Sequence, residues 1–202
     1  EHQLREEKDA LKAIESYQAA LNANPSKDLA GKAIKGIALA RYDRKDYDMA
    51  ATEFLKLITE YPTVVLPEEI YIWSGQWFFD AEQWDNASNV FSAMLKALPN
   101  YQYPDKVRLK IAECAEKSGK TDEAMEKYKA VADAPGAGAL ALEAQFRLAK
   151  MLEAKGDLDK AIALYESASE ANTGDIPAQA RFRLGELYEN KGELDRAARN
   201  YM

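Results

Sequence analysis

Residues 148–165 read LAKMLEAKGDLDKAIALY, and this stretch decides the fold. Ala149 and Ala161 are small residues twelve positions apart, and the aromatic residue Tyr165 follows one helical turn after the second of them. A small residue lets one helix approach its neighbour closely, and an aromatic ring one turn further on fills the space between the two helices. Gly156 lies between them and can adopt a positive φ angle that ends the first helix. The stretch therefore predicts two helices that pack as a hairpin.

The same arrangement occurs five times along the chain, at intervals of 37, 37, 37 and 36 residues. An incomplete copy precedes these five, with Ala13, Tyr17 and Pro25 at the corresponding positions. The complete copies contain a small residue of the first helix (Ala38, Gly75, Ala112, Ala149, Gly185), an alanine of the second helix (Ala50, Ala87, Ala124, Ala161, Ala197) and an aromatic residue (Phe54, Phe91, Tyr128, Tyr165, Tyr201). Because a fixed period of this length is typical of stacked helix pairs, the sequence predicts an all-α solenoid.

We expect one array over residues 1–202: a right-handed α-α superhelix of about five helix pairs with a partial pair at its N-terminal end. The expected pairs cover residues 31–62, 68–99, 105–133, 139–171 and 176–202, and the partial pair covers 3–23. Pro104, Pro135-Gly136 and Asn172-Thr173-Gly174 mark connections between pairs. The chain begins inside one expected helix and stops inside another, so we expect it to be a fragment of a longer protein.

The composition argues against several classes of function. A formal net charge of −7 repels phosphate backbones, so nucleic acid is a poor candidate partner. No apolar run reaches the roughly 18 residues that a membrane-spanning helix needs. Cys114 is the only cysteine and occurs at a repeat position that is otherwise apolar, which predicts a packed thiol. The only histidine, His2, is near the chain end, and this argues against histidine-based catalysis and most metal sites. We therefore predict neither an enzyme nor a bound cofactor.

The repeats resemble the tetratricopeptide repeat family. Besides the stretch quoted above, the last copy matches the family motif through Leu184-Gly185-x-x-Tyr188, Gly192, Ala197 and Tyr201. The tryptophan usual near the start of the first helix is replaced by Ile34, Tyr71, Arg108, Gln145 and Arg181. The period is 36 or 37 residues, whereas the family period is about 34. This longer spacing is similar to that of bacterial cell-envelope members, such as the accessory protein of the Tol–Pal system and the lipoprotein of β-barrel assembly.

The resemblance implies that the first helix of each pair lines a concave groove that binds a peptide or protein segment. One stripe of each first helix, spaced i, i+4, i+7, faces that groove. In the second half of the chain the stripe is charged, with Glu113, Glu116, Lys150, Glu153, Arg183 and Glu186. The candidate binding residues are Lys35, Leu39, Tyr42, Ile72, Trp73, Gln76, Phe79, Lys106 and Lys110. The three lysines among them, Lys35, Lys106 and Lys110, occur at plausible positions for a carboxylate clamp. Leu39 and Trp73 replace the asparagines of such a clamp, so we do not predict one.

Trp73 is the most informative residue of the stripe, because three other copies place lysine or arginine at its position. An aromatic residue at a position that is elsewhere polar is what an exposed recognition patch requires. Packing of Trp73, Tyr42 and Phe79 on neighbouring helices is an alternative that the sequence leaves open. Trp77 occurs at a position that is apolar in the other copies, and we expect it to be packed.

The leading functional hypothesis is a scaffold or adaptor that binds a protein or peptide in the groove. A self-assembling structural module is one alternative, because unfinished terminal repeats leave apolar helix faces uncovered. A regulatory array attached to a larger enzyme, or to a secretion or envelope complex, is another. The likeness to envelope members favours a bacterial periplasmic location, and a cytoplasmic location stays open.

Overall fold

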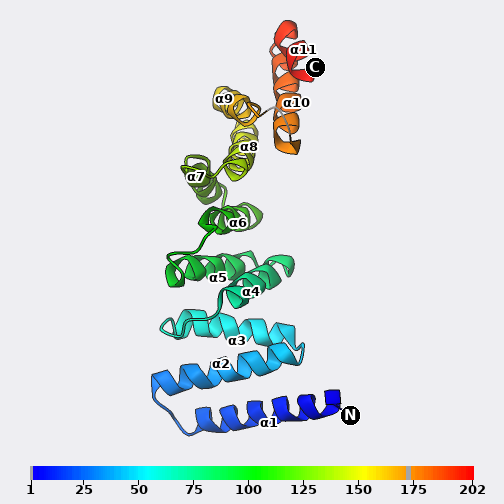
Figure 1. Ribbon diagram of the computed structural model, residues 1–202. Coiled ribbons are helices and arrows are strands. Elements are labelled where there is room, and N and C mark those ends of the chain that lie inside the picture. The colour runs from blue at the N-terminus through cyan, green and yellow to red at the C-terminus, as the bar shows by residue number, and fades with distance from the viewer. Residues whose placement is uncertain (1, 172–173) are drawn as a thin grey trace. The chain divides into compact units, whose positions relative to one another are not determined.

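The computed structural model describes residues 2–171 and 174–202, which form α-helices and no strands. The prediction of an all-α repeat fold is confirmed. The helices, labelled in Figure 1, are α1 (His2–Asn22), α2 (Lys27–Asp43), α3 (Tyr47–Glu60), α4 (Glu68–Asp80), α5 (Trp84–Ala97), α6 (Pro104–Lys117), α7 (Thr121–Ala132), α8 (Ala139–Ala154), α9 (Leu158–Ala168), α10 (Asp175–Asn190) and α11 (Leu194–Tyr201). The predicted connection at Asn172-Thr173 and the side chain of His2 lie outside the part that the structure describes.

Local sequence signals explain where individual helices begin. Helix α2 begins at Lys27 rather than near residue 31, because Ser26 caps it: the Ser26 hydroxyl accepts a hydrogen bond from the backbone N–H of Leu29 at 3.5 Å. Helix α6 begins at Pro104, whose missing N–H costs nothing in the first turn of a helix.

The turn inside each helix pair contains one residue in the left-handed region. Gly119, Gly156 and Gly192 have φ angles of 72°, 84° and 76°, which confirms the predicted role of these glycines. Lys45 and Glu82 occupy the same repeat position with φ angles of 65° and 58°. A side chain with a Cβ atom is strained in this conformation, so the two N-terminal turns are less favourable than the three that contain glycine.

We expect the substitution Glu82→Gly to raise the free energy of unfolding by about 1 kcal/mol, because it removes this backbone strain at an exposed position. The matched substitution Gly119→Ala, at the equivalent turn, should lower the free energy of unfolding by a similar amount. Guanidinium unfolding followed by circular dichroism measures both changes, and a destabilising Glu82→Gly would contradict the argument.

The chain divides into two compact units, Glu1–Tyr101 and Gln102–Met202, which we call unit 1 and unit 2. Unit 1 contains α1 to α5, and unit 2 contains α6 to α11 (Figure 1). In each unit the repeated alanines and the aromatic residues other than Tyr201 form the core, and Ala50, Phe54, Ala124 and Tyr128 are fully buried.

The repeated small residues allow the close helix contact that the sequence predicts. A Cβ atom added at Gly75 of α4 would overlap the ring of Phe91 on α5, and one added at Gly185 of α10 would overlap the ring of Tyr201 on α11. In these two helix pairs the aromatic ring of the second helix therefore lies directly against the small residue of the first helix.

Candidate functional site

The seven predicted binding residues of unit 1 lie on α2 and α4, the first helices of its helix pairs. Ile72 is 40% exposed, and the other six are half-buried. Lys35 Nζ donates a hydrogen bond to the carbonyl oxygen of Val65 at 3.2 Å, and Gln76 Nε2 donates one to Asp80 Oδ1 at 2.7 Å. The stripe thus has one well-exposed apolar side chain next to polar groups that already have intramolecular partners.

Trp73 lies at the centre of a group of five rings that joins α2, α3 and α4. We call Tyr42, Tyr47, Phe54, Trp73 and Trp77 the aromatic cluster. The centroid of the Trp73 ring is 4.7 Å from that of Tyr42, in an edge-on arrangement, and 5.7 Å from that of Trp77, in a stacked one. The centroids of Tyr47 and Phe54 are 5.5 and 6.1 Å away. Trp73 therefore packs between two successive helix pairs, and its half-buried ring still contributes to the surface.

The equivalent positions in unit 2 hold a polar link instead of rings. Tyr128 of α7 donates its hydroxyl hydrogen to Glu116 of α6 at 2.5 Å, and the guanidinium of Arg147 on α8 lies 3.5 Å from the same carboxylate. Two repeats earlier, the position of Tyr128 is occupied by Phe54, that of Glu116 by Tyr42 and that of Arg147 by Trp73. The next junction repeats the link: Tyr165 bonds Glu153 at 2.8 Å, and Arg183 lies 4.0 Å from that carboxylate. We call these two groups the tyrosine–glutamate–arginine links.

Four residues of the charged stripe of unit 2 contact a neighbouring helix: Glu113, Glu116, Glu153 and Arg183. Glu113 is only 8% exposed and lies 2.7 Å from Lys110 and 3.2 Å from Arg147. Lys106 is exposed, with its ammonium nitrogen 4.8 Å from the centre of the Tyr103 ring. The predicted residues Lys106 and Lys110 thus belong to unit 2, and Lys110 is already paired.

Burial raises the pKa of both Tyr128 and Tyr165 above the usual tyrosine value, and the adjacent glutamate carboxylates raise these pKa values further. In the unfolded chain these phenols ionise near pH 10. A raised folded-state pKa contributes stability that is complete below pH ~10 and is lost as the pH rises above it. We therefore expect unit 2 to unfold progressively in alkali above about pH 10.

Phenolate absorbance and far-ultraviolet circular dichroism, recorded together, test this expectation. The double variant Tyr128→Phe/Tyr165→Phe should be less stable at neutral pH, and its stability should depend less on alkaline pH. If its alkaline transition matches that of the wild-type chain, the two links are not its cause.

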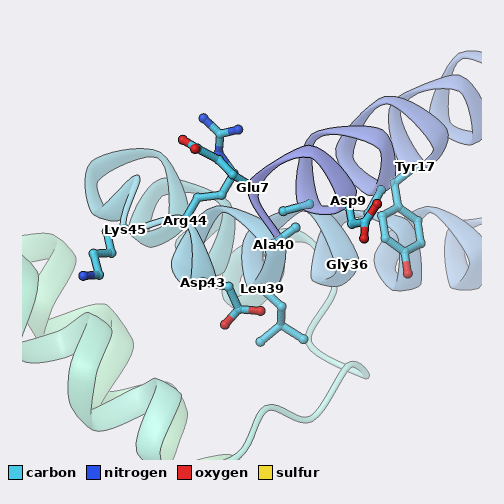
Figure 2. Close-up of a pocket in the computed structure, with 11 residues that line it drawn as sticks. Glu7, Asp9, Tyr17, Gly36, Leu39, Ala40, Asp43, Arg44 and Lys45 are labelled. Atoms are coloured by element: carbon cyan, nitrogen blue, oxygen red, sulfur yellow. The ribbon is translucent and has the colours of Figure 1, made fainter. Parts of the chain in front are cut away.

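A cavity that the sequence does not predict lies between α1 and α2. Its volume is about 850 Å³, and Figure 2 shows its wall. The apolar part of the wall comes from Ala10, Ala13 and Tyr17 on α1 and from Leu39 and Ala40 on α2. Of the wall residues only Leu39 belongs to the predicted stripe. The incomplete copy, with Ala13 and Tyr17 at the positions of a second helix, is the sequence signal that could have located the cavity.

Other kinds of site have little support in the structure. The described residues contain no cluster of histidine, cysteine, aspartate or glutamate that could hold a metal ion. Cys114 is fully buried, as predicted. Within residues 2–171 and 174–202, no helix combines the length and apolar character needed to cross a bilayer.

Comparison with known proteins identifies the repeat. A family model described as a tetratricopeptide repeat-like domain matches residues 75–202, and a tetratricopeptide repeat model matches residues 36–63. No curated protein matches the chain significantly.

Solved structures with the same fold share little sequence identity with the chain. MamA is 18% identical, with 82% of this chain and 90% of MamA covered and a TM-score of 0.59. BtubC (BKLC) from P. vanneervenii is 15% identical, with 97% and 87% covered and a TM-score of 0.56. PilF of Pseudomonas aeruginosa is 11% identical, with 96% and 90% covered and a TM-score of 0.55. These likenesses show the fold, and with the family match over residues 75–202 they establish that the chain belongs to the tetratricopeptide repeat family, whose folds are generally protein-interaction modules.

Proposed function

We propose that the protein is a non-catalytic scaffold that binds a peptide or protein segment along α2 and α4 of unit 1. The observation that carries this proposal is the position of Ile72, an exposed apolar side chain, next to the half-buried ring of Trp73. An apolar or aromatic anchor surrounded by polar groups is the usual composition of a binding hot spot. Lys35 and Gln76 supply polar groups of this kind.

The chemistry of unit 1 favours a basic or neutral partner segment. Unit 1 contains 16 acidic and 11 basic residues, so it accounts for most of the net charge of −7. Complementary charge speeds association and disfavours acidic competitors more than it adds to affinity. We therefore expect the bound segment to combine an apolar anchor with lysine or arginine side chains.

The strongly perturbed ionisable groups have structural roles, which supports a function without catalysis. A catalytic acid or base has a pKa shifted towards the working pH. The pKa values of Tyr128 and Tyr165 are shifted away from neutrality, and each phenol donates a hydrogen bond to a glutamate on the first helix of its own pair.

A peptide display library selected against the full chain tests the proposal, with Ile72→Glu as the site variant. Phe182→Glu is the matched control, because Phe182 occupies the same repeat position in unit 2 and is 56% exposed. Both substitutions place a charge at an exposed site and should leave the fold intact.

We expect the selected peptides to bind the wild-type chain and Phe182→Glu equally well. Their affinity for Ile72→Glu should be reduced roughly tenfold or more, as expected for a central anchor. Selected peptides that bind the wild-type chain and Ile72→Glu with equal affinity would place the interaction elsewhere.

A further inference from the structure

The connection between α3 and α4, residues 61–67, lies against α2, and we call it the strap (Figure 1). A Cβ atom added at Gly31 of α2 would lie 2.8 Å from Val64 Cγ2 and 3.2 Å from Tyr61 Cδ1. The corresponding positions of the other first helices hold Glu68, Asp105, Leu142 and Ala178. Because each of these residues has a Cβ atom, the glycine at position 31 is what allows the strap to approach α2 so closely.

Two hydrogen bonds and a buried side chain hold the strap in this place. Lys35 Nζ of α2 donates a hydrogen bond to the carbonyl oxygen of Val65 at 3.2 Å. The backbone of Leu66 forms a hydrogen bond with the hydroxyl of Tyr71 on α4. Leu66 and Tyr71 are only 2% and 3% exposed. The strap is thus bonded to α2 at one residue and to α4 at the next.

Val65 is the strap residue whose side chain faces outward. It is 55% exposed and lies between half-buried Val64 and buried Leu66, as the alternation of an extended chain requires. Lys35 and Ile72 occupy the same repeat position on α2 and α4, at the N-terminal end of the candidate stripe. Because the Lys35 ammonium reaches the backbone of Val65, the strap passes α2 at this end. Val65 and Ile72 are therefore two exposed aliphatic side chains at the same end of the stripe.

The acidic groups beside these side chains favour a basic neighbour. Glu68 and Glu69 lie one helical turn before Ile72, so they are its neighbours on the surface of α4. Both are exposed, and neither forms an ion pair with a described residue. On α2, the charge of Lys32 is already neutralised by Asp28, at 2.6 Å. The two glutamates can therefore accept a lysine or arginine of a partner.

Lys35 also lies beside the strap and carries a positive charge. Its Nζ bonds a neutral carbonyl oxygen, and no carboxylate of the described residues pairs with it. An ammonium group has three N–H donors, so two stay available to a partner. Backbone carbonyl groups of an extended peptide can accept these hydrogen bonds. Two carboxylates against one ammonium still leave a net negative charge for a basic side chain.

We propose that the partner segment binds here in an extended conformation, with an aliphatic side chain between Val65 and Ile72 and a lysine or arginine two residues away. This inference rests on the proposed function and names the residue pattern that the site selects. One helical turn spans about 5.4 Å, close to the roughly 6.6 Å between side chains two residues apart on one face of an extended chain. The basic side chain pairs with Glu68 or Glu69, and a backbone carbonyl group of the segment bonds Lys35. The strap is one wall of the site.

Selection from a randomised peptide display library against the full chain tests the pattern. We expect enriched peptides to carry an aliphatic residue two positions from a lysine or arginine. Selection against Glu68→Gln/Glu69→Gln should no longer enrich the basic residue, whereas selection against Asp48→Asn should still enrich it. Asp48 is the matched control, because it is also an exposed acidic residue in the first turn of a helix of unit 1. Equal enrichment of the basic residue against all three chains would overturn the role of the two glutamates.

Fluorescence anisotropy with one selected peptide tests the strap directly. Val65→Gln should weaken binding roughly fivefold, because it removes an aliphatic contact. Met49→Gln is the matched control and should leave the affinity unchanged, since Met49 lies on α3 and is 57% exposed. Circular dichroism checks that both variants fold, as expected for substitutions at exposed positions.

A double-mutant cycle and the variant Ile72→Glu separate this inference from the proposed function. Changing the aliphatic residue of the peptide to alanine should cost much less affinity against Val65→Gln than against the wild-type chain. Equal losses would overturn the assignment of Val65. Peptides that lose affinity for Ile72→Glu but not for Val65→Gln would overturn this inference and leave the proposed function standing. Peptides that bind Ile72→Glu as tightly as the wild-type chain would overturn both.

Discussion

Replacing Trp73 by alanine should lower the free energy of unfolding of unit 1 by about 3 kcal/mol, near the low end of large-to-small substitutions in cores. The Trp73 ring contacts four other rings on three helices, and aromatic pairs contribute more than the area they bury. Its removal leaves a void at the junction between two helix pairs. Because the ring is half-buried, the expected loss is smaller than for a fully buried tryptophan.

Tryptophan fluorescence during guanidinium unfolding measures this loss selectively. All the tryptophans of the chain lie in unit 1, and Trp77 and Trp84 remain as reporters after the substitution. Ile72→Ala is the matched control, because Ile72 is adjacent in sequence and 40% exposed, and it should cost less than ~1 kcal/mol. A Trp73→Ala variant as stable as the control would show that the cluster adds little to the junction and would favour a purely recognition role for Trp73.

Replacing Tyr128 by alanine should destabilise unit 2 by about 4 kcal/mol, because the ring is fully buried and forms part of the core. Replacing it by phenylalanine keeps the ring and removes only the hydroxyl that bonds Glu116. This smaller change should cost about 1–2 kcal/mol, the range for a hydrogen bond to a charged group. The difference between the variants separates ring packing from the tyrosine–glutamate–arginine link.

Amide hydrogen exchange of α6, α7 and α8 is the appropriate measurement, because unit 2 contains no tryptophan. Both substitutions should increase exchange in these helices and leave α2 to α4 unchanged. A Tyr128→Phe variant with unaltered exchange would mean that water replaces the hydroxyl contact to Glu116 at no cost. A loss of protection spread equally over both units would mean that the two units unfold together.

The aromatic cluster and the tyrosine–glutamate–arginine links show that one repeat position can join neighbouring helix pairs either through aromatic rings or through charged groups. Trp73 and Arg147 are equivalent in sequence, and each reaches back from a first helix to the preceding helix pair. The sequence comparison correctly identified Trp73 as different from its charged equivalents. It could not decide between recognition and packing, because that depends on whether the rings of Tyr42, Tyr47 and Phe54 come within contact distance. The structure places Trp73 and Trp77 in one stack, whereas the sequence predicted packing for Trp77 and left Trp73 open between recognition and packing.

The sequence by itself determined the all-α repeat, the close contact of Gly75 and Gly185 with aromatic rings, and the left-handed turns at Gly119, Gly156 and Gly192. These features follow from local spacing and from the size of single residues. Only the tertiary structure decided that Glu116 and Glu153 bond buried tyrosines and that a cavity remains beside Ala13 and Tyr17. Such features depend on side chains from different helices meeting in space, and the free energy of those contacts is set by burial and by the partners that each group finds.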